Sequence, residues 1–564
     1  NRFGGDSSEV DLSSGVSQVF SNRYAFAALK EDGSVVSWGG GSAGGDSTSV
    51  SSSLSSGVSR IYSTLEAFAA LKDDGSVITW GDKRYGGDSS YVDSSGNTIS
   101  VSSSLSSGVS QIFSTYSAFA AIKDDGSVIT WGGDYLSDQD YGGDSSAVSS
   151  ELGSDVSQIV SNPFAFAALK DDGSVITWGD NRYGGDSSAV SNKLNARVSQ
   201  VFSTTYAFAA LKENGSVISW GDSTAGGESS EVDGLSNVSQ IFSTESAFAA
   251  LKNDGSVVTW GDEDFGGDST SVSSSLNSGV SQIYFTDSAF AALKDDGSVV
   301  TWGEERTGGD SSYRDSSNYR ISVSSSLSSG VSQIYSNNDA FAALKDDGSV
   351  VTWGYNRFGG DSSEVDLSSG VSHIYSNFRA FAALKDDGSV VTWGEEDRGG
   401  DSSEVSSELS SGVVGFADLF TNDIFDFTIY GGSGNDTLLG DQTANTIKGG
   451  SGADNLYGKA DADKLYGETG NDTLNGGLGN DRLVGGEGTD TAVFSSRKNT
   501  INLGSTARQN TGDGRDILIG IENVNGGGGN DTITGSRGKN ILNGGGGNDT
   551  LNGGLGNDRL VGGE

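Results

Sequence analysis

The stretch AFAALKDDGSVVTWG at residues 380–394 recurs nine times along the chain, with small variations, and each copy contains one tryptophan. These are Trp38, Trp80, Trp131, Trp178, Trp220, Trp260, Trp302, Trp353 and Trp393. Successive tryptophans are 40 to 51 residues apart. A unit that recurs in this way buries its apolar face against its neighbours. We therefore predict an array of about nine similar units.

Each copy predicts a β-hairpin. An apolar run at 380–384 is followed by Asp386-Asp387-Gly388 and then by a second run that ends at Trp393. Gly388 can adopt the positive φ that a short hairpin requires. Small alanines beside a large Phe and Trp favour close packing, so we expect these aromatic residues to form the core.

The hairpins are separated by a Gly-Gly-Asp-Ser motif, as at 184–187, a variable serine-rich stretch and a third predicted strand, as at 330–336. The variable stretch is longest at 91–101 and 313–323. Insertions at one point of a repeat indicate one loop-bearing rim. If the array binds a partner, we expect the contacts on such rims. The most variable rim loops are 83–85, 181–183 and 304–306.

Composition limits the classes of function. The chain has 76 acidic and 34 basic residues and a formal net charge of −42. This acidity opposes binding to nucleic acid or to an anionic membrane, and it favours cations. With no Cys and a single histidine, His373, thiol, Ser-His-Asp and His-rich metal chemistry are disfavoured, so we expect no enzyme. No apolar run is long enough for a transmembrane segment.

The repeat motif resembles the propeller repeats of the regulator of chromosome condensation family. The resemblance rests on ALKDDGSVVTWG at 383–394 and NRFGG at 356–360, and it covers residues 1–412. It implies a β-propeller, a fold that bacterial members use to bind proteins. The family's histidine before Ala-Leu is absent, and Gly-Gly-Asp replaces Gly-Gln-Leu-Gly. Nine copies exceed the usual range of about four to eight blades, so a large ring, a ring with surplus repeats and an open spiral all stay open.

A second period, of nine residues, begins at Gly431. Seven copies run in phase to Val493, and four more follow from Gly526. These copies, such as GGSGADNLY at 449–457, resemble the RTX nonapeptide family, whose GGxGxDxUx repeats wind a parallel β-roll that binds calcium. The resemblance implies several Ca²⁺ ions as cofactor. It also implies type I secretion to the outside of a Gram-negative-type bacterium, at the cell surface or beyond.

The period explains which residues calcium would use. The glycines of a six-residue turn expose carbonyl oxygens, the sixth residue supplies a carboxylate, and the apolar eighth residue points inward. Because turns alternate sides, acids two repeats apart share an ion. The predicted ligands are Asp436, Asp454, Asp472 and Asp490 on one side, Asn445, Asp463 and Asp481 on the other, and Asp531, Asp549, Asn540 and Asp558 in the second block. The asparagines lack a charge, so we expect weaker sites there.

The chain is therefore predicted to be all-β, with a propeller-like array followed by a parallel roll. The expected regions are the array at 1–412, a junction strand or cap at 413–430, a first roll block at 431–494, a spacer at 495–525 and a second roll block at 526–564.

Two functions fit this organisation. The first is an extracellular structural or adhesive protein, stiffened by calcium, that self-associates head to tail into filaments or sheets. The second is a secreted propeller that binds a protein or glycan through variable rim loops, with the RTX repeats serving secretion and calcium-triggered folding. Exposed aromatics and arginines clustered on one rim would favour the second. Such pairs occur at 84–85, 182–183 and 357–358.

Overall fold

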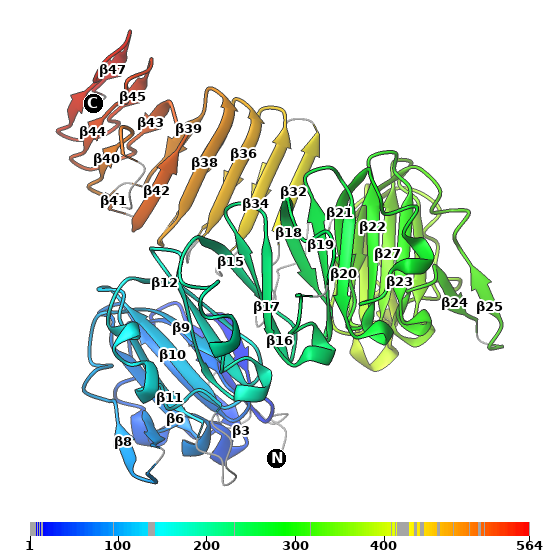
Figure 1. Cartoon of the computed structure of the whole chain (residues 1–564), viewed down its shortest axis with the longest axis horizontal. Coiled ribbons are helices and arrows are strands. Elements are labelled where there is room, and N and C mark those ends of the chain that lie inside the picture. The colour runs from blue at the N-terminus through cyan, green and yellow to red at the C-terminus, as the bar shows by residue number, and fades with distance from the viewer. Residues whose placement is uncertain are drawn as a thin grey trace. The chain divides into compact units, whose positions relative to one another are not determined.

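The structure is a computed structural model of the 564-residue chain, and it divides into two compact units, residues 1–417 and 418–564. Both units are all-β, and the helices of the described residues are short 3-10 turns (Figure 1). In the described part of the chain, no helix has the length and hydropathy needed to cross a membrane. The described residues are 7, 10, 12, 15–93, 95–133, 141–230, 232–315, 317–407, 409–411, 413, 428–433, 437–439, 445–459, 463–477, 479–495, 497–505, 509–512 and 514–562.

Among the described residues, the first unit is a series of nine antiparallel three-stranded arrays, here called blades 1 to 9. Eight of them are separate sheets, and blade 8 belongs to a five-stranded sheet that also includes an inserted hairpin. Their strands are, in blade order, β1 (Val16–Ser21), β2 (Ala25–Lys30), β3 (Val35–Gly39); β4 (Val58–Ser63), β5 (Ala67–Lys72), β6 (Val77–Gly81); β9 (Val109–Ser114), β10 (Ala118–Lys123), β11 (Val128–Gly132); β12 (Val156–Ser161), β13 (Ala165–Lys170), β14 (Val175–Gly179); β15 (Val198–Ser203), β16 (Ala207–Lys212), β17 (Val217–Gly221); β18 (Val238–Ser243), β19 (Ala247–Lys252), β20 (Val257–Gly261); β21 (Val280–Phe285), β22 (Ala289–Lys294), β23 (Val299–Gly303); β26 (Val331–Ser336), β27 (Ala340–Lys345), β28 (Val350–Gly354); β29 (Val371–Ser376), β30 (Ala380–Lys385), β31 (Val390–Gly394).

The hairpin predicted from the repeat is the second and third strand of each blade. In blade 9, β30 and β31 pair from Ala380 opposite Gly394 to Leu384 opposite Val390. Gly388 in the connecting turn has a φ of 76°, which a residue with a side chain rarely adopts. The predicted hairpin is confirmed.

The interfaces between blades share one composition. Ala165, Ala167 and Leu169 of blade 4 pack against Phe208 and Trp220 of blade 5. The other interfaces repeat this set, with Ile122 in place of the leucine in blade 3. Within each blade the Phe and Trp rings stack with centroids 5.1 to 5.4 Å apart. The aromatic residues of the repeat are therefore core residues, as predicted.

The Gly-Gly-Asp motif has a steric reason. The indole Nε1 of Trp220 donates a hydrogen bond to the carbonyl oxygen of Gly184, 3.0 Å away. A Cβ on Gly184 would clash with the ring of Phe208, and a Cβ on Gly185 would clash with the carbonyl of Gly179. The two glycines let the chain pass close over the aromatic core.

The blades are arranged in series. Among the described residues, every core cluster of this unit joins two blades that are consecutive in the chain, and none joins blade 9 to blade 1. Side chains also connect successive first strands, as where Ser203 Oγ donates to the Ser161 carbonyl at 3.1 Å. Of the three arrangements left open by the sequence, these contacts favour the open series.

Short 3-10 turns follow the third strands or fall within the serine-rich stretches. They are η1 (Gly41–Ala43), η2 (Thr48–Val50), η3 (Lys83–Tyr85), η4 (Ser146–Val148), η5 (Glu151–Gly153), η6 (Asn181–Tyr183), η7 (Ser188–Val190), η8 (Ser223–Ala225), η9 (Glu263–Phe265), η10 (Thr270–Val272), η11 (Glu305–Thr307), η12 (Asn356–Phe358), η13 (Glu396–Arg398) and η14 (Ser403–Val405).

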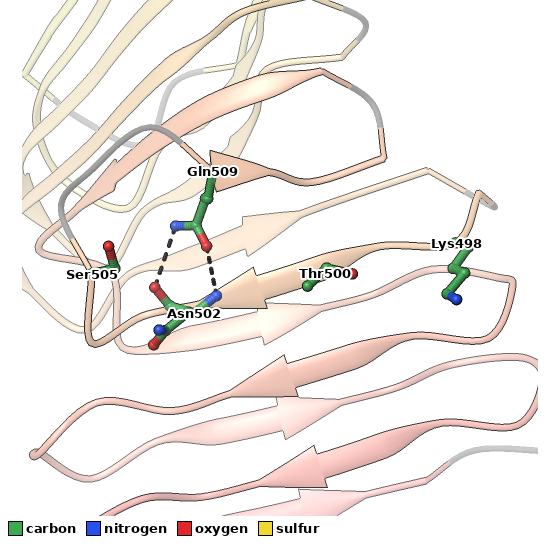
Figure 2. A pocket seen from close by; sticks show the side chains of 5 residues that line it. All are labelled: Lys498, Thr500, Asn502, Ser505 and Gln509. Atoms are coloured by element: carbon green, nitrogen blue, oxygen red, sulfur yellow. Dashed lines mark hydrogen bonds between the residues drawn. The ribbon is translucent and has the colours of Figure 1, made fainter.

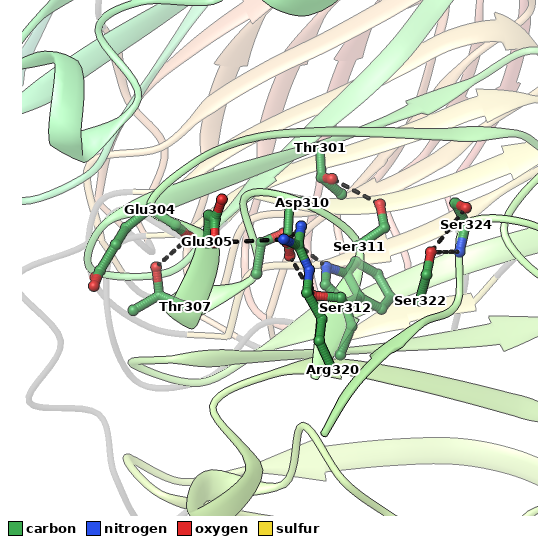
Figure 3. A network of polar contacts seen from close by, with 12 residues as sticks. Thr301, Glu304, Glu305, Thr307, Asp310, Ser311, Ser312, Arg320, Ser322 and Ser324 are labelled. Carbon is green, nitrogen blue, oxygen red and sulfur yellow. Dashed lines mark hydrogen bonds and ion pairs between the residues drawn. The ribbon is translucent and has the colours of Figure 1, made fainter. Parts of the chain in front are cut away.

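The two long insertions form extra β-hairpins, β7 (Ser90–Val92) with β8 (Thr98–Ser100) and β24 (Ser312–Arg314) with β25 (Arg320–Ser322). Arg320 fixes the second hairpin at its base. Its guanidinium forms ion pairs with Asp310 and, at 3.6 Å, with Glu305 of η11 (Figure 3). Its Nε also donates to Ser312 Oγ at 3.1 Å.

The second unit is a parallel roll, as predicted, with its strands stacked in sequence along the roll (Figure 1). One sheet contains β32 (Thr428–Ser433), β34 (Thr446–Ser451), β36 (Lys464–Gly470), β38 (Arg482–Gly488), β42 (Arg515–Ile519) and, at its edge, β41 (Gln509–Asn510). The second contains β33 (Thr437–Leu439), β35 (Asn455–Tyr457), β37 (Thr473–Asn475), β39 (Thr491–Val493), β43 (Asn523–Asn525), β45 (Ile541–Asn543) and β47 (Arg559–Val561). The third contains β40 (Thr500–Asn502), β44 (Thr532–Thr534) and β46 (Thr550–Asn552).

The apolar eighth residues of the repeats form the core of the roll. Ile447, Leu456, Leu465 and Leu474 are fully buried, and Leu438 packs against them. The inward direction predicted for this position is therefore confirmed.

The expected spacer, residues 495–525, contributes strands to the same sheets. Leu518 of β42 lies opposite Leu483 of β38, and Ile501 of β40 lies opposite Ile533 of β44. The roll therefore continues through the interruption in the repeat. The expected junction at 413–430 falls mainly outside the described residues.

Candidate metal centre and binding rim

The acids at the sixth position of the repeats form ladders along the roll. The backbone N–H of Asp454 donates to Oδ1 of Asp472, and that of Asp472 donates to Oδ1 of Asp490, both at 2.9 Å. The structure therefore brings together acids two repeats apart. Equivalent bonds join Asn445 to Asp463 at 2.7 Å, Asp463 to Asp481 at 2.9 Å, Asp531 to Asp549 at 2.9 Å and Asn540 to Asp558 at 2.9 Å. Asp436 lies outside the described residues.

Whether the ladders can bind a cation depends on the second carboxylate oxygen of each aspartate, Oδ2. Among the described residues, Oδ2 of Asp472, Asp490 and Asp549 is buried without a hydrogen-bond partner. Burial, together with the charges of Asp490 and Asp454, raises the pKa of Asp472 to about 6. Burial and the charge of Glu522 raise the pKa of Asp490. A buried carboxylate with an unpaired oxygen is costly, and a bound cation removes that cost.

Carbonyl oxygens complete the donor set. A Cβ on Gly467 would clash with both Asp472 Oδ2 and the carbonyl oxygen of Gly485, so these two oxygens approach the same point. Among the described residues, no three His, Cys, Asp or Glu side chains gather as a metal cluster. Backbone oxygens must therefore supply most ligands, which suits calcium, a hard ion that takes about six to eight oxygens.

Asn540 differs from the aspartates. Its Nδ2 donates to the carbonyl of Glu522 at 2.7 Å, and its Oδ1 accepts from the N–H of Ser536 at 2.7 Å. This amide already finds partners within the chain. Because its amide group is already hydrogen-bonded within the chain, Asn540 has less capacity to bind calcium. The weaker calcium site at this residue stays a prediction.

Three ladder members were missed from the sequence. The N–H of Asp481 donates to Oδ1 of Asp516 at 2.9 Å, and Asp490 donates to Oε2 of Glu522 at 2.9 Å. Asn499 donates to Oδ1 of Asp531 at 2.8 Å. A signal existed for Asp516, because GDGRDIL at 512–518 keeps the GxGxDxU part of the repeat. No repeat signal marks Glu522.

The C-terminal unit, residues 418–564, matches a known family of repeats. A family model described as RTX calcium-binding nonapeptide repeat (4 copies) matches residues 430–465, 457–492 and 523–563. The C-terminal unit contains RTX repeats. Their presence indicates calcium binding, in agreement with the donor set of the ladders. No curated protein matches the chain.

Several solved structures resemble parts of the chain. Yeast RCC1 (Prp20), bound to Kap60, has 17% identity, with 43% of this chain and 70% of that chain covered and a TM-score of 0.28. The ectodomain of the Physcomitrella patens receptor kinase CR4 has 15% identity, 51% and 72% coverage and a TM-score of 0.27. The computationally designed Ika8 protein has 14% identity, 68% and 96% coverage and a TM-score of 0.25.

A shallow hollow of about 500 Å³ lies on the roll beside β40. The side chain of Gln509 accepts from the N–H of Asn502 at 2.7 Å and donates to its carbonyl at 3.3 Å (Figure 2). Lys498, Thr500 and Ser505 complete its lining. These five side chains include no acid and no aromatic ring, and we assign the hollow no ligand.

The blade unit has a rim where the loops between first and second strands meet the 3-10 turns. Asn162 Nδ2 donates to the carbonyl of Tyr183 in η6 at 2.7 Å, which holds the two loops together. Neighbouring blades are joined by bonds such as that from the Tyr116 N–H to the Pro163 carbonyl at 3.0 Å. Pro163 has no N–H to pass this contact on to blade 5.

Five aromatic rings gather on this rim, and we call them the Phe164 cluster. Phe164 lies 5.6 Å from Tyr116, 5.7 Å from Tyr141, 4.7 Å from Tyr183 and 5.8 Å from Tyr206, measured between ring centroids. Tyr116 remains 40% exposed. Since the rings come from blades 3, 4 and 5, stacking of the blades creates the cluster.

Arginines accompany the rim aromatics. Arg182 lies over Tyr183, 4.9 Å from the ring centroid, and forms an ion pair with buried Asp180 at 2.6 Å. Arg84 lies over Tyr85 in the same way, at 5.9 Å. Phe358 is likewise covered by an arginine, which comes from the loop of the next blade. Arg379 lies over the Phe358 ring at 4.8 Å, and Arg357 and Arg379 both form ion pairs with Glu395, at 2.8 and 3.1 Å.

The rim of blades 6 to 8 is acidic instead. Glu245, Asp287 and Asp339 occupy the same loops as the aromatic residues. Burial, with the charges of Glu245 and Asp339, raises the pKa of Asp287 to about 7. Asn338 Nδ2 donates to Asp287 Oδ2 at 2.9 Å, which opposes that rise.

We expect Asp287→Asn to stabilise the blade unit by about 2 kcal/mol at pH 8 and to have little effect at pH 4. The native state holds the Asp287 proton up to about pH 7, whereas the unfolded state loses it near pH 4. The stability of the unaltered chain therefore falls as pH rises through this window. Denaturant titrations at both pH values, in constant calcium, measure the difference. Asp397→Asn, at an exposed position, is the control, and equal effects of Asp287→Asn at both pH values would contradict the assignment.

Proposed function

We propose that this chain is an extracellular, calcium-stabilised binding protein that attaches to a cell-surface glycan through the Phe164 cluster. The cluster is the observation that carries the proposal. Accessible aromatics beside an exposed arginine on one rim are typical of binding sites. Tyr116 is exposed and the other four rings are half-buried, whereas the framework of the blades hardly varies. The RTX unit supports an extracellular location, because such repeats accompany type I secretion and fold in calcium.

The chemistry of the cluster favours a glycan. Aromatic rings offer flat apolar faces for the C–H faces of sugars, and the exposed Arg182 guanidinium can donate to hydroxyl or carboxylate groups. The net charge of −42 opposes the binding of acidic glycans, except where arginines such as Arg182 supply a local positive charge. A protein partner is the alternative outcome of the same experiment.

Binding should depend on the rings. We expect Phe164→Ala and Tyr206→Ala each to weaken binding about tenfold or more, since central aromatic residues contribute most of the affinity at such sites. Glycan arrays identify a ligand, and calorimetry with that ligand measures the loss. Tyr319→Ala is a matched control, because Tyr319 is 70% exposed in an inserted hairpin.

Two results would contradict this function. Unchanged affinity of the Phe164→Ala variant for a glycan that the chain binds would remove the cluster from the site. The second result is that the chain binds no glycan but binds one purified surface protein saturably, and that Phe164→Ala abolishes this binding. The partner would then be a protein and not a glycan.

Self-association into filaments or sheets is the second candidate. The observation that favours it is the heterologous interface between blades, in which the Ala-rich face of one blade meets the Phe and Trp of the next. Among the described residues, no core cluster closes this series on blade 1. Electron microscopy in millimolar calcium and after chelation tests this candidate. Ordered filaments that dissolve on chelation would support it, and dispersed particles would oppose it.

A further inference from the structure

The segment between the two groups of RTX repeats, residues 493–522, lies outside the ranges that the family model matches. Its end nevertheless enters the roll in register. β39 pairs with β43, with Ala492 opposite Val524, and the N–H of Asn523 donates to the Asp490 carbonyl at 2.8 Å. Glu522 is thereby placed beside Asp490, 32 residues earlier in the chain.

A regular turn provides the reference. At Asp472, Oδ1 accepts from the backbone of the preceding ladder member, and Oδ2 lies near the carbonyl oxygen of Gly485, two turns on. The N–H of Asp472 donates to the carboxylate of Asp490. One site thus combines the carboxylate of one turn with the glycine carbonyl and the carboxylate of a later turn.

The turn at 485–490 has the same three elements, two of them from the unmatched segment. Asp490 is fully buried, and its Oδ2 has no hydrogen-bond partner among the described residues. A Cβ on Gly485 would clash with this oxygen and with the carbonyl oxygen of Gly520, so both approach one point. The Asp490 N–H donates to Oε2 of Glu522 at 2.9 Å.

We propose that Asp490, the Gly520 carbonyl and Glu522 bind a calcium ion that joins the first group of RTX repeats to the segment after it. Glu522 comes two positions after Gly520, whereas Asp490 comes five positions after Gly485, as in the regular repeats. The nonapeptide pattern therefore does not include Glu522. The longer glutamate side chain compensates for this shorter spacing. The donors are hard oxygens with two carboxylates, which suit calcium. This proposal does not depend on the function of the rim.

The other two turns of the segment contrast with this one. Thr511 Oγ1 donates to Oδ2 of Asp516, so a hydroxyl replaces the cation as partner of that carboxylate. Asn499 Nδ2 donates to the carbonyl oxygens of Arg497 at 2.7 Å and Gly526 at 2.8 Å, where an aspartate would offer no donor. We therefore expect one ion in the segment, at Asp490 and Glu522.

The test measures calcium bound to the full chain by equilibrium dialysis. Glu522→Gln should lower the stoichiometry by one ion, or weaken one site at least tenfold, because it removes one of two carboxylates. Glu487→Gln is the matched control, since Glu487 is exposed on the same turn. Wild-type stoichiometry and affinity in the Glu522→Gln variant would overturn the proposal.

A second measurement does not require a folded variant. Crystals of the unaltered chain, grown in calcium and exchanged with a lanthanide, should show an anomalous peak between the Asp490 and Glu522 carboxylates. If that peak is absent while peaks occur at regular repeats, the site does not exist.

Discussion

Removal of calcium should unfold the roll and leave the nine blades folded. The buried oxygens of Asp472, Asp490 and Asp549 have no hydrogen-bond partner among the described residues, so without a cation the roll retains uncompensated charge in its interior. In the described part of the blades, the core clusters consist of apolar side chains, and buried carboxylate oxygens without a partner are confined to the roll, so the blades depend on apolar packing. We expect metal binding and folding of the roll to be coupled, as in other small metal-dependent units.

Tryptophan fluorescence separates the two units, because all nine tryptophans lie in the blades. On chelation the tryptophan emission should stay unchanged, while circular dichroism loses part of its β signal. Trypsin should then cut rapidly at Lys464, Arg482 and Arg515, which lie in strands of the roll. Calcium should reverse these changes, and magnesium at the same concentration is the control. A roll that stays protease-resistant after chelation would contradict the calcium assignment.

Trp220→Ala should destabilise the blade unit by about 3 to 5 kcal/mol. Trp220 is 3% exposed, and its ring stacks on Phe208 with centroids 5.4 Å apart. The substitution leaves a cavity at the interface of blades 4 and 5 and removes the hydrogen bond to Gly184. Because each blade is stabilised mainly by its neighbours, the effect should spread to blade 4.

Trp38→Ala is the matched control. Trp38 occupies the same position of the repeat and stacks on Phe26 at 5.3 Å, but it is only half-buried. Its replacement should therefore cost clearly less. Guanidinium titrations in constant calcium, followed by circular dichroism, compare the two variants. Equal losses would show that burial between blades does not set the stability of the array.

The predictability of the fold follows from the range of the interactions that create it. The hairpin at 380–394 depends on a turn glycine and on residues a few positions away, so one stretch suffices to predict it. The roll likewise depends on spacing within nine residues, and the inward direction of Leu456 follows from the period alone.

The candidate sites were predictable to different degrees. The aspartate ladders followed from the period, because acids 18 residues apart occupy equivalent turns. Glu522 did not, because its contact with Asp490 depends on parallel pairing across an irregular segment. The contact of Arg379 with Phe358 also has no local signal, because it joins residues of two blades that stacking brings together.

The sequence by itself determined the repeating elements of this protein: hairpin blades, a parallel roll and its calcium chemistry. These depend on residues close together in the chain, where spacing dictates which side chains share a face. Only the tertiary structure decided that the rings of Tyr116, Phe164 and Tyr206 meet on one rim and that Glu522 completes a turn begun at Gly485. Such contacts arise from the stacking of whole units, and no local pattern records which variable residues that stacking brings together.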